Sequence, residues 1–120
     1  HLIISNYFHS VQSTVVNNSE IITELNKKMP IAELFEYYFA GSNPLENWKN
    51  RPNINQLLEY KNEIDFATNW ILETLTENAL SEPTEIGNPI AKTKYDALTF
   101  TFKHQMWHNG QIAMIKRIVG

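Results

Sequence analysis

The chain has 120 residues, of which 42% are hydrophobic and 12% aromatic, enough for a single folded domain with its own core. It contains no cysteine, which excludes disulfides, a thiolate nucleophile and cysteine-ligated zinc or iron–sulfur centres. A net charge of −3 argues against a broad nucleic-acid-binding surface. No apolar run approaches the ~20 residues of a membrane span and no signal segment opens the chain, so we expect one cytoplasmic domain over residues 1–120 with no nucleic-acid or membrane partner.

The first stretch predicts an amphipathic helix from His1 to about Val16. Side chains of its expected inward seam recur at spacings of three and four, and they are His1, Ile4, Phe8, Val11 and Val15. No capping residue precedes His1 and the sequence does not begin with Met, so we expect this helix to begin further upstream in the intact protein. Short polar residues at 17–19 favour a break, after which Ser19 could cap a short helix through Leu25.

A second break separates the next two predicted helices. Pro30 suits the first turn of a helix over residues 31–40, and Gly41 is expected to end it. The interval 41–53 is rich in Gly, Ser, Asn and Pro, a composition typical of an irregular connection.

The second half of the chain predicts two long helices. Apolar spacing indicates one from Ile54 to about Leu80, capped by Asn53 or Asn55. A break containing two prolines and a glycine follows at residues 81–89, and the last helix is expected over residues 90–119.

These elements predict an all-α protein. No strand-like alternation and no internal repeat is visible, and three long helices with a short one suit an up-and-down bundle. Three long helices alone leave a trough that an upstream helix would close. We therefore predict a four-helix bundle whose first helix is absent from, or truncated in, this chain.

Two of the four histidines lie four residues apart in the last predicted helix. At this spacing, β-carbons are about 6 Å apart on one helix face, so His104 and His108 can point at a single metal ion. By itself such a pair is a weak signal, because solvated or hydrogen-bonded histidines without any metal show the same spacing. Both belong to a three-four seam that we expect to face inward, namely Ala97, Thr101, His104, His108, Gln111, Ile115 and Ile118.

A third imidazole is available from the first helix. His1 leads the inward seam of that helix, and three nitrogen ligands would leave one coordination position for water or substrate. His9 is about a quarter turn off the seam, so we predict that it lies on the surface or the helix flank. Phe102, Met106 and Trp107 are predicted to be core side chains.

The segment from His104 to Ile112 reads H-Q-M-W-H-N-G-Q-I and resembles the H-x-x-x-H-x-G-Q segment in the last helix of the DinB-like (YfiT-like) metalloenzymes of bacteria. Arg117 and Gly120 occur where that family often ends this helix. In the family, the second helix of a four-helix bundle supplies a further histidine near its start, commonly followed by an apolar residue, as in His1-Leu2. The resemblance covers essentially the whole chain, is specific at its two ends, and implies one more helix before His1.

The resemblance implies that His1, His104 and His108 ligate a divalent metal ion, with nickel or zinc the usual suggestions. Gln111 would then hold a ligand ring or a water molecule beside the metal, and its alternative role is a helix–helix hydrogen bond. Gly110 would let a neighbouring helix come close.

The same resemblance implies a metal-dependent enzyme acting on a small molecule. Characterised relatives include transferases and isomerases that use a low-molecular-weight thiol such as bacillithiol or mycothiol. No carboxylate of this chain has an evident general-base position beside the histidines, which suits thiol activation better than hydrolysis.

Two alternatives stay open. The chain could be a non-catalytic binding or dimerisation module with a structural metal or none, and family members often form homodimers. Alternatively, His1 could be a mature N-terminus that binds copper through its amine and ring, as in the histidine-brace oxygenases. Those oxygenases are β-sandwiches, so the helical pattern argues against this last alternative.

Overall fold

The computed structural model describes residues 1–39 and 51–119, and its regular elements there are all helices. In chain order they are α1 (Leu2–Asn6), the π-helix η1 (Tyr7–Gln12), α2 (Glu20–Lys28), α3 (Ile31–Tyr38), α4 (Ile54–Thr74), α5 (Glu77–Leu80) and α6 (Lys94–Val119). Apart from an isolated bridge between Pro83 and Thr93, this part of the chain has no β-structure. The predicted all-α class is confirmed.

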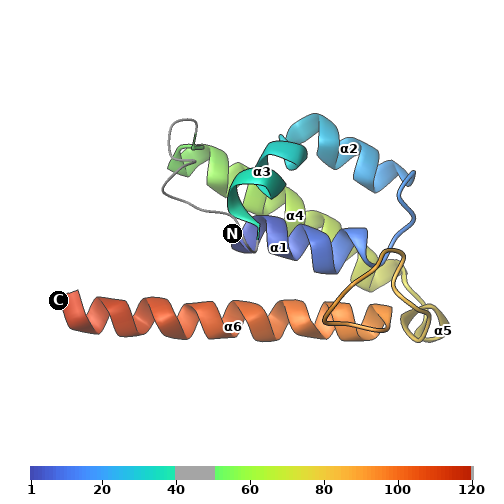
Figure 1. Cartoon of the computed structure of the whole chain (residues 1–120). Helices are drawn as coiled ribbons and strands as arrows, with labels where there is room; N and C mark the ends of the chain where they lie inside the picture. The colour runs from blue at the N-terminus through green and yellow to red at the C-terminus, as the bar shows by residue number, and fades with distance from the viewer. Residues whose placement is uncertain (40–50, 120) are drawn as a thin grey trace.

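The segment formed by α1 and η1 lies in the middle of the molecule (Figure 1). Helices α2, α3 and α4 lie on one side of it, and α6 runs alongside it on the other. The C-terminal part of α6 continues past the N-terminal end of α1, where no other described helix accompanies it. None of the helices in residues 1–39 and 51–119 is long and apolar enough to cross a membrane.

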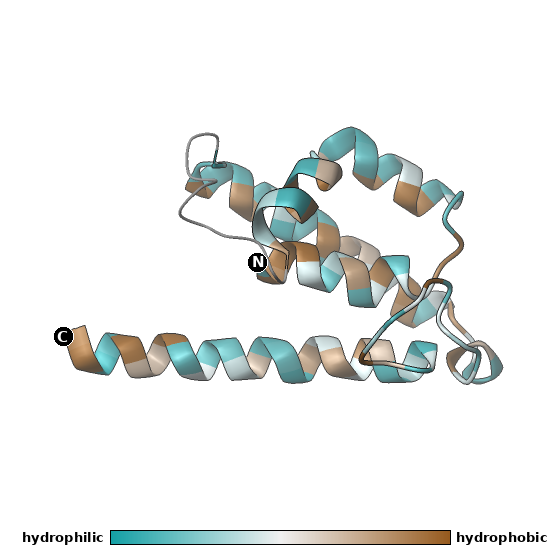
Figure 2. Cartoon of the chain, in the orientation of Figure 1, coloured by the Kyte–Doolittle hydropathy of each residue, from teal (hydrophilic) through white to brown (hydrophobic). Residues whose placement is uncertain are grey.

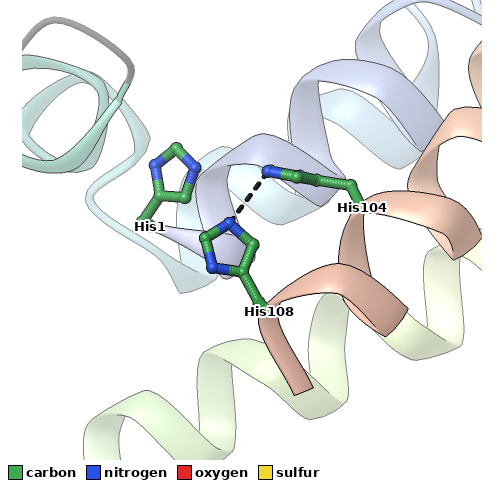
Figure 3. Close-up of side chains that lie close together, drawn as sticks. All are labelled: His1, His104 and His108. Atoms are coloured by element: carbon green, nitrogen blue, oxygen red, sulfur yellow. Dashed lines mark hydrogen bonds between the residues drawn. The ribbon is translucent and has the colours of Figure 1, made fainter. Parts of the chain in front are cut away.

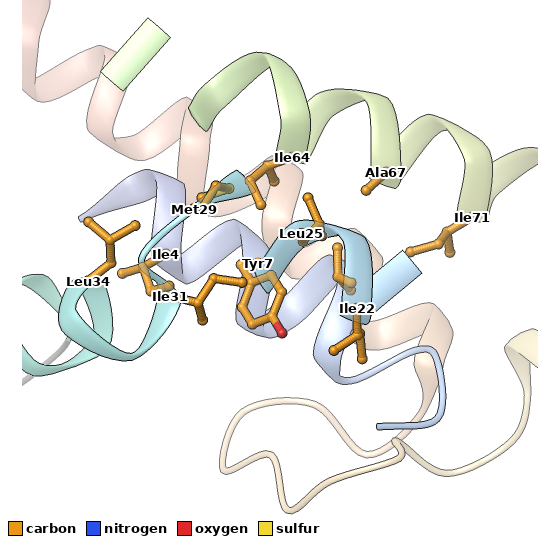
Figure 4. Packing of buried hydrophobic residues seen from close by; sticks show 11 residues of the cluster. Ile4, Tyr7, Ile22, Leu25, Met29, Ile31, Leu34, Ile64, Ala67 and Ile71 are labelled. Carbon is orange, nitrogen blue, oxygen red and sulfur yellow. The ribbon is translucent and has the colours of Figure 1, made fainter. Parts of the chain in front are cut away.

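The hydrophobic core joins α1 and η1 to α2, α3 and α4 (Figure 4). From the first helix it receives Ile4, Tyr7 and Val11. Tyr7 takes the place predicted for Phe8, which is only partly buried, and His1, the first residue of the predicted seam, is exposed. Its remaining buried members are Ile22, Leu25, Met29, Ile31, Leu34, Ile64, Ala67 and Ile71. Dense apolar packing of this kind fixes the position of α1, and with it the position of His1.

The first helix ends earlier than predicted and changes form along its length. It stops at Gln12 instead of about Val16, and its second half is a π-helix in which the Ser13 amide donates to the Phe8 carbonyl. The Ser13 and Thr14 hydroxyls also donate to backbone carbonyls at the end of this helix, at 2.8 and 2.6 Å. Side-chain hydroxyls that compete for helical carbonyls favour such distortions.

The predicted middle helices exist with different bounds. Ser19 is the N-cap residue of α2, although its hydroxyl makes no capping hydrogen bond, and the helix runs to Lys28, beyond the predicted end at Leu25. Helix α3 ends at Tyr38, earlier than predicted. The expected stop at Gly41 and most of the 41–53 connection lie outside the described residues.

Asn53 caps α4 as predicted, because its side chain accepts from the Gln56 amide while the Gln56 side chain accepts from the Asn53 amide. The helix ends at Thr74, not Leu80, and extended Leu75 separates it from the single turn of α5.

Helix α6 begins at Lys94, four residues later than predicted. The Asn88 side chain accepts from the Ile90 and Ala91 amides, which satisfies those amides in a turn. Thr93, just before the helix, acts as its N-cap, because its hydroxyl accepts a hydrogen bond from the Asp96 amide.

The prediction that the seam of α6 faces inward is correct only for the first half of the helix. Ala97 and Thr101 are buried, but Gln111, Ile115 and Ile118 are exposed, the last by 78%. Three side chains predicted to be core, Phe102, Met106 and Trp107, are also exposed. Figure 2 shows hydrophobic residues along the end of α6 that lies beyond the other described helices. Within the described residues, no partner covers these apolar side chains, so the predicted inward placement is wrong for this half of the helix.

Candidate metal centre

Three histidines from opposite ends of the sequence meet in the structure (Figure 3). His1 immediately precedes α1, whereas His104 and His108 lie one turn apart in the middle of α6. Each offers a ring nitrogen, and these three nitrogens lie within 4.8 Å of one another. The grouping predicted from the sequence is therefore present in space.

The spacing of the three rings is close to that of a ligand set. The Nε2 atoms of His104 and His108 are 3.0 Å apart, and the His1 ring centroid is 5.4 Å from each of the other two. Nitrogens bound tetrahedrally at 2.0–2.1 Å from one ion are about 3.4 Å apart. The three nitrogens, all within 4.8 Å of one another, are therefore close to this separation.

Hydrogen bonds hold the far side of two of the rings. His1 Nδ1 donates to the Tyr38 carbonyl oxygen at 3.0 Å, so Nε2 of that ring keeps its lone pair. The Ser5 hydroxyl hydrogen-bonds to His104 Nδ1 at 3.2 Å and leaves Nε2 facing His108. Metal-ligating histidines characteristically engage their second nitrogen in this way, which fixes the tautomer and the ring orientation.

The surroundings of His104 favour its neutral form. Burial lowers the pKa of His104, and the positive charge that His108 can carry lowers it further. The His104 ring also stacks on Phe100, with centroids 5.2 Å apart. Neutral imidazole is the form that binds a metal ion, so this environment prepares His104 for ligation.

His9 is buried, contrary to the prediction that it lies on the surface or helix flank; only 4% of it is exposed. The prediction failed because the first helix is covered on two sides: α6 and the 81–93 loop pack over the face that carries His9. Asn88 Nδ2 donates to His9 Nδ1 at 3.0 Å, and the Phe100 ring lies 4.6 Å from the His9 ring. Burial, and secondarily the charge of His104, lower the pKa of His9 to about 4.

The tautomer of His9 follows from the Asn88 amide. Asn88 Oδ1 accepts from two backbone amides, so its Nδ2 is the group that faces the ring. His9 Nδ1 is therefore an acceptor without a proton. The Nδ1 lone pair of His9 thus accepts a hydrogen bond that connects η1 to the loop at Asn88. His9 does not belong to the three-histidine cluster.

Two residues expected beside the cluster do not contribute to it. Gln111 is exposed, and its side chain makes no hydrogen bond within the described residues. At Gly110, an added Cβ would meet no atom within 4 Å, so the described chain brings no helix close to it. The role proposed for Gln111 is filled instead by Ser5, which the sequence analysis missed although it lies one turn after His1.

The cluster provides three imidazole donors and includes no carboxylate among the described residues. It can hold a divalent ion that prefers nitrogen ligands, with coordination positions left for a further ligand. Comparisons of the chain with protein-family models, with curated proteins and with solved structures give no match.

Proposed function

We propose that the chain is a metal-dependent enzyme of the DinB-like type, in which His1, His104 and His108 hold one divalent ion, nickel or zinc. The convergence of these three imidazoles carries the proposal, because His1 is more than 100 residues from His104 and His108 in the sequence and the three ligand nitrogens lie within 4.8 Å of one another. Chance placement on the surface would not also engage the outer nitrogens of two rings with Tyr38 and Ser5.

The donor set suits the activation of a thiol. When bound, the ion supplies positive charge that stabilises a thiolate at neutral pH. His1, His104 and His108 bind it as neutral ligands, and Ser5 holds the orientation of His104. Since the cluster offers no carboxylate as a general base, we propose a transferase that uses a low-molecular-weight thiol, acting on a small molecule in the cytoplasm.

The four-helix bundle of the DinB-like family is part of this proposal. The segment α1–η1, α4 and α6 would be three of its long helices, and a further helix would cover the exposed apolar side chains of α6. Met106, Ile115 and Ile118 support this arrangement because each is more than half exposed.

The same exposed surface supports a second candidate function, a dimerisation module in which the metal is structural or absent. A structural site is closed by a fourth protein ligand, whereas a catalytic site keeps an open position. The three-nitrogen set favours the enzyme, and the apolar face of α6 favours the module.

Metal analysis of protein purified without a polyhistidine tag tests the proposal. We expect about one first-row divalent ion per chain, because the three histidines together form a single binding site. Protein that folds normally and binds no such ion at micromolar concentrations would contradict the metal site.

The variant His104→Ala should release the ion while circular dichroism shows unchanged helix content. Asn109→Ala is the matched control, because Asn109 is exposed on the same helix and lies outside the cluster. Full metal affinity in His104→Ala would show that the ion binds elsewhere. An open coordination position, seen as binding of an added thiol to the Co²⁺-loaded protein by absorption spectroscopy, would separate the enzyme from the structural module.

A further inference from the structure

A cavity of about 190 Å³ lies directly beside His1. Its walls are mostly aliphatic and come from α1, α3 and the start of α4, with Ile3, Leu34 and Leu57 as representatives. Arg51 is the one Lys, Arg, Asp or Glu among the described residues that line it. For scale, an apolar cavity of about 150 Å³ is large enough to bind benzene.

The cavity and the histidine cluster share the same supporting residues. His1 lines the cavity and belongs to the cluster. Tyr38 also lines the cavity, and its carbonyl accepts the hydrogen bond from His1 Nδ1. A molecule in the cavity would therefore contact a residue whose ring faces His104 and His108.

The polar end of the cavity lies at Arg51. A second cavity of about 320 Å³ shares Leu34, Tyr38, Arg51 and Pro52 with the first, and its other lining residues include Glu33 and Gln56. Arg51 thus stands where an apolar space meets a more polar one. A guanidinium has five N–H donors, so Arg51 can contact a ligand carboxylate in addition to the interactions it already makes.

We propose that this cavity is the substrate pocket of the candidate metal centre, and that its ligand is a small acid with an apolar body about the size of one ring. The apolar part lies among Ile3, Leu34 and Leu57, and the carboxylate points to Arg51. The assignment to a substrate rests on the proposed function, whereas binding of the acid itself does not require the metal.

Another cavity, of about 340 Å³ between α2 and α4, fits this ligand less well. It is lined by Phe66 and Trp70, but Glu20, Glu24 and Glu63 also surround it, and Lys28, which pairs with Glu63, offsets only one of these three charges. These carboxylates would repel an anion. The α2–α4 cavity is therefore an internal control for where an acid binds.

Titration of metal-free, ¹⁵N-labelled protein with sodium benzoate, and separately with neutral benzyl alcohol, tests the pocket by NMR. Benzoate should shift the amide signals of Ile3 and Leu57 and leave those of Phe66 and Trp70 unchanged. It should bind about two- to fivefold more tightly than benzyl alcohol because of the charge on Arg51. Shifts confined to the α2–α4 cavity, or equal affinity for the two probes, would overturn the proposal.

Two variants locate the binding and its charge preference. Leu57→Trp should fill the cavity and weaken benzoate binding by about tenfold or more, whereas Leu58→Trp, at a half-exposed neighbouring position that lines neither cavity, should bind as the unmodified chain does. Arg51→Gln should abolish the preference for benzoate over benzyl alcohol. Wild-type affinity in Leu57→Trp, or a preference that survives in Arg51→Gln, would contradict the pocket.

The metal test and the binding test fail separately. If benzoate binds at Ile3 and Leu57 in a chain that takes up no ion, the proposed pocket is supported and the metal-dependent function is refuted. If His104 and His108 bind an ion but benzoate does not bind in the cavity, the metal-dependent function is supported and the proposed pocket is refuted.

Discussion

The two halves of α6 have similar sequence patterns and different surroundings. In residues 94–104, Ala97 is fully buried, Leu98 is nearly so, and the Thr101 hydroxyl accepts a hydrogen bond from Ser10 at 2.9 Å. In residues 105–119, Met114 and Ile118 are 65% and 78% exposed. His104 and His108 lie at the boundary: Ser5 of the first helix hydrogen-bonds to His104, and the His1 ring lies 5.4 Å from the His108 ring. The difference shows that burial of a helix face depends on its partner as well as on its own pattern.

The partner of the first half is the small, polar face of the first helix. Ser5, Asn6 and Ser10 hydrogen-bond to His104, Gln105 and Thr101, respectively. Small side chains let two helices approach closely. The Ser5 and Ser10 hydroxyls and the Asn6 amide nitrogen each find a partner across the contact, whereas the Asn6 amide oxygen is buried without one. This polar contact positions His104, whereas the apolar packing of α1 positions His1.

Matched substitutions of two alanines should give the largest contrast between the halves. Ala97→Glu places a carboxylate at a fully buried position and should lower the free energy of unfolding by about 3 kcal/mol or more. Ala113→Glu introduces the same side chain at an exposed position and should change the free energy of unfolding by less than about 0.5 kcal/mol. Urea unfolding followed by circular dichroism measures both.

Equal destabilisation by the two glutamates would show that residues 105–119 are covered in solution. An unaffected Ala97→Glu would contradict the contact between the first half of α6 and the first helix.

His9 should make the packing of the first half dependent on pH. Its pKa is about 4 in the folded protein and near 6.5 in the unfolded chain, so the unfolded chain binds more protons between these values. The stability that neutral His9 provides is complete above pH 6.5 and is lost as the pH falls towards 4. The expected loss is about 3 kcal/mol.

Unfolding free energies of the unmodified chain and of His9→Gln between pH 4 and 7 isolate this effect. Glutamine removes the titrating group, so the slope with pH should be smaller in the variant. His104 shifts in the same direction and titrates in both proteins. Identical slopes would contradict the burial of a neutral His9 against Asn88 and Phe100.

The sequence predicted the cluster because helical spacing alone places His104 beside His108, and the seam of the first helix places His1 on an inward line. It did not predict that the first helix is covered on two sides. Ser5, His9 and Ser10 form no hydrophobic stripe, so periodicity gave no sign that they would be buried. The bounds of α4 and α6 were missed for a related reason, since hydrogen bonds of Thr76 and Asn88 interrupt otherwise helical patterns.

The candidate ligands should depend on the packed side of the boundary. Ser5→Ala removes the hydroxyl that hydrogen-bonds to His104 Nδ1 and should weaken metal binding by about tenfold. Gln111→Ala alters the exposed side and should change the affinity by less than about twofold. Competition titrations with a chelator measure both constants. A larger loss in Gln111→Ala than in Ser5→Ala would restore the role for Gln111 that the sequence predicted.

The smallest expected effect concerns Gly110, just beyond the boundary. It lies inside α6, where glycine is less favourable than alanine by about 0.5–1 kcal/mol, and an added Cβ meets no atom within 4 Å. Gly110→Ala should therefore raise the free energy of unfolding by about that amount, measured in urea at two protein concentrations. A decrease would mean that another helix approaches Gly110 closely in solution, and a decrease found only at the higher concentration would identify that helix as part of a second copy. The exposed half of α6 would then be an interface, and the asymmetry between its halves would belong to the isolated chain alone.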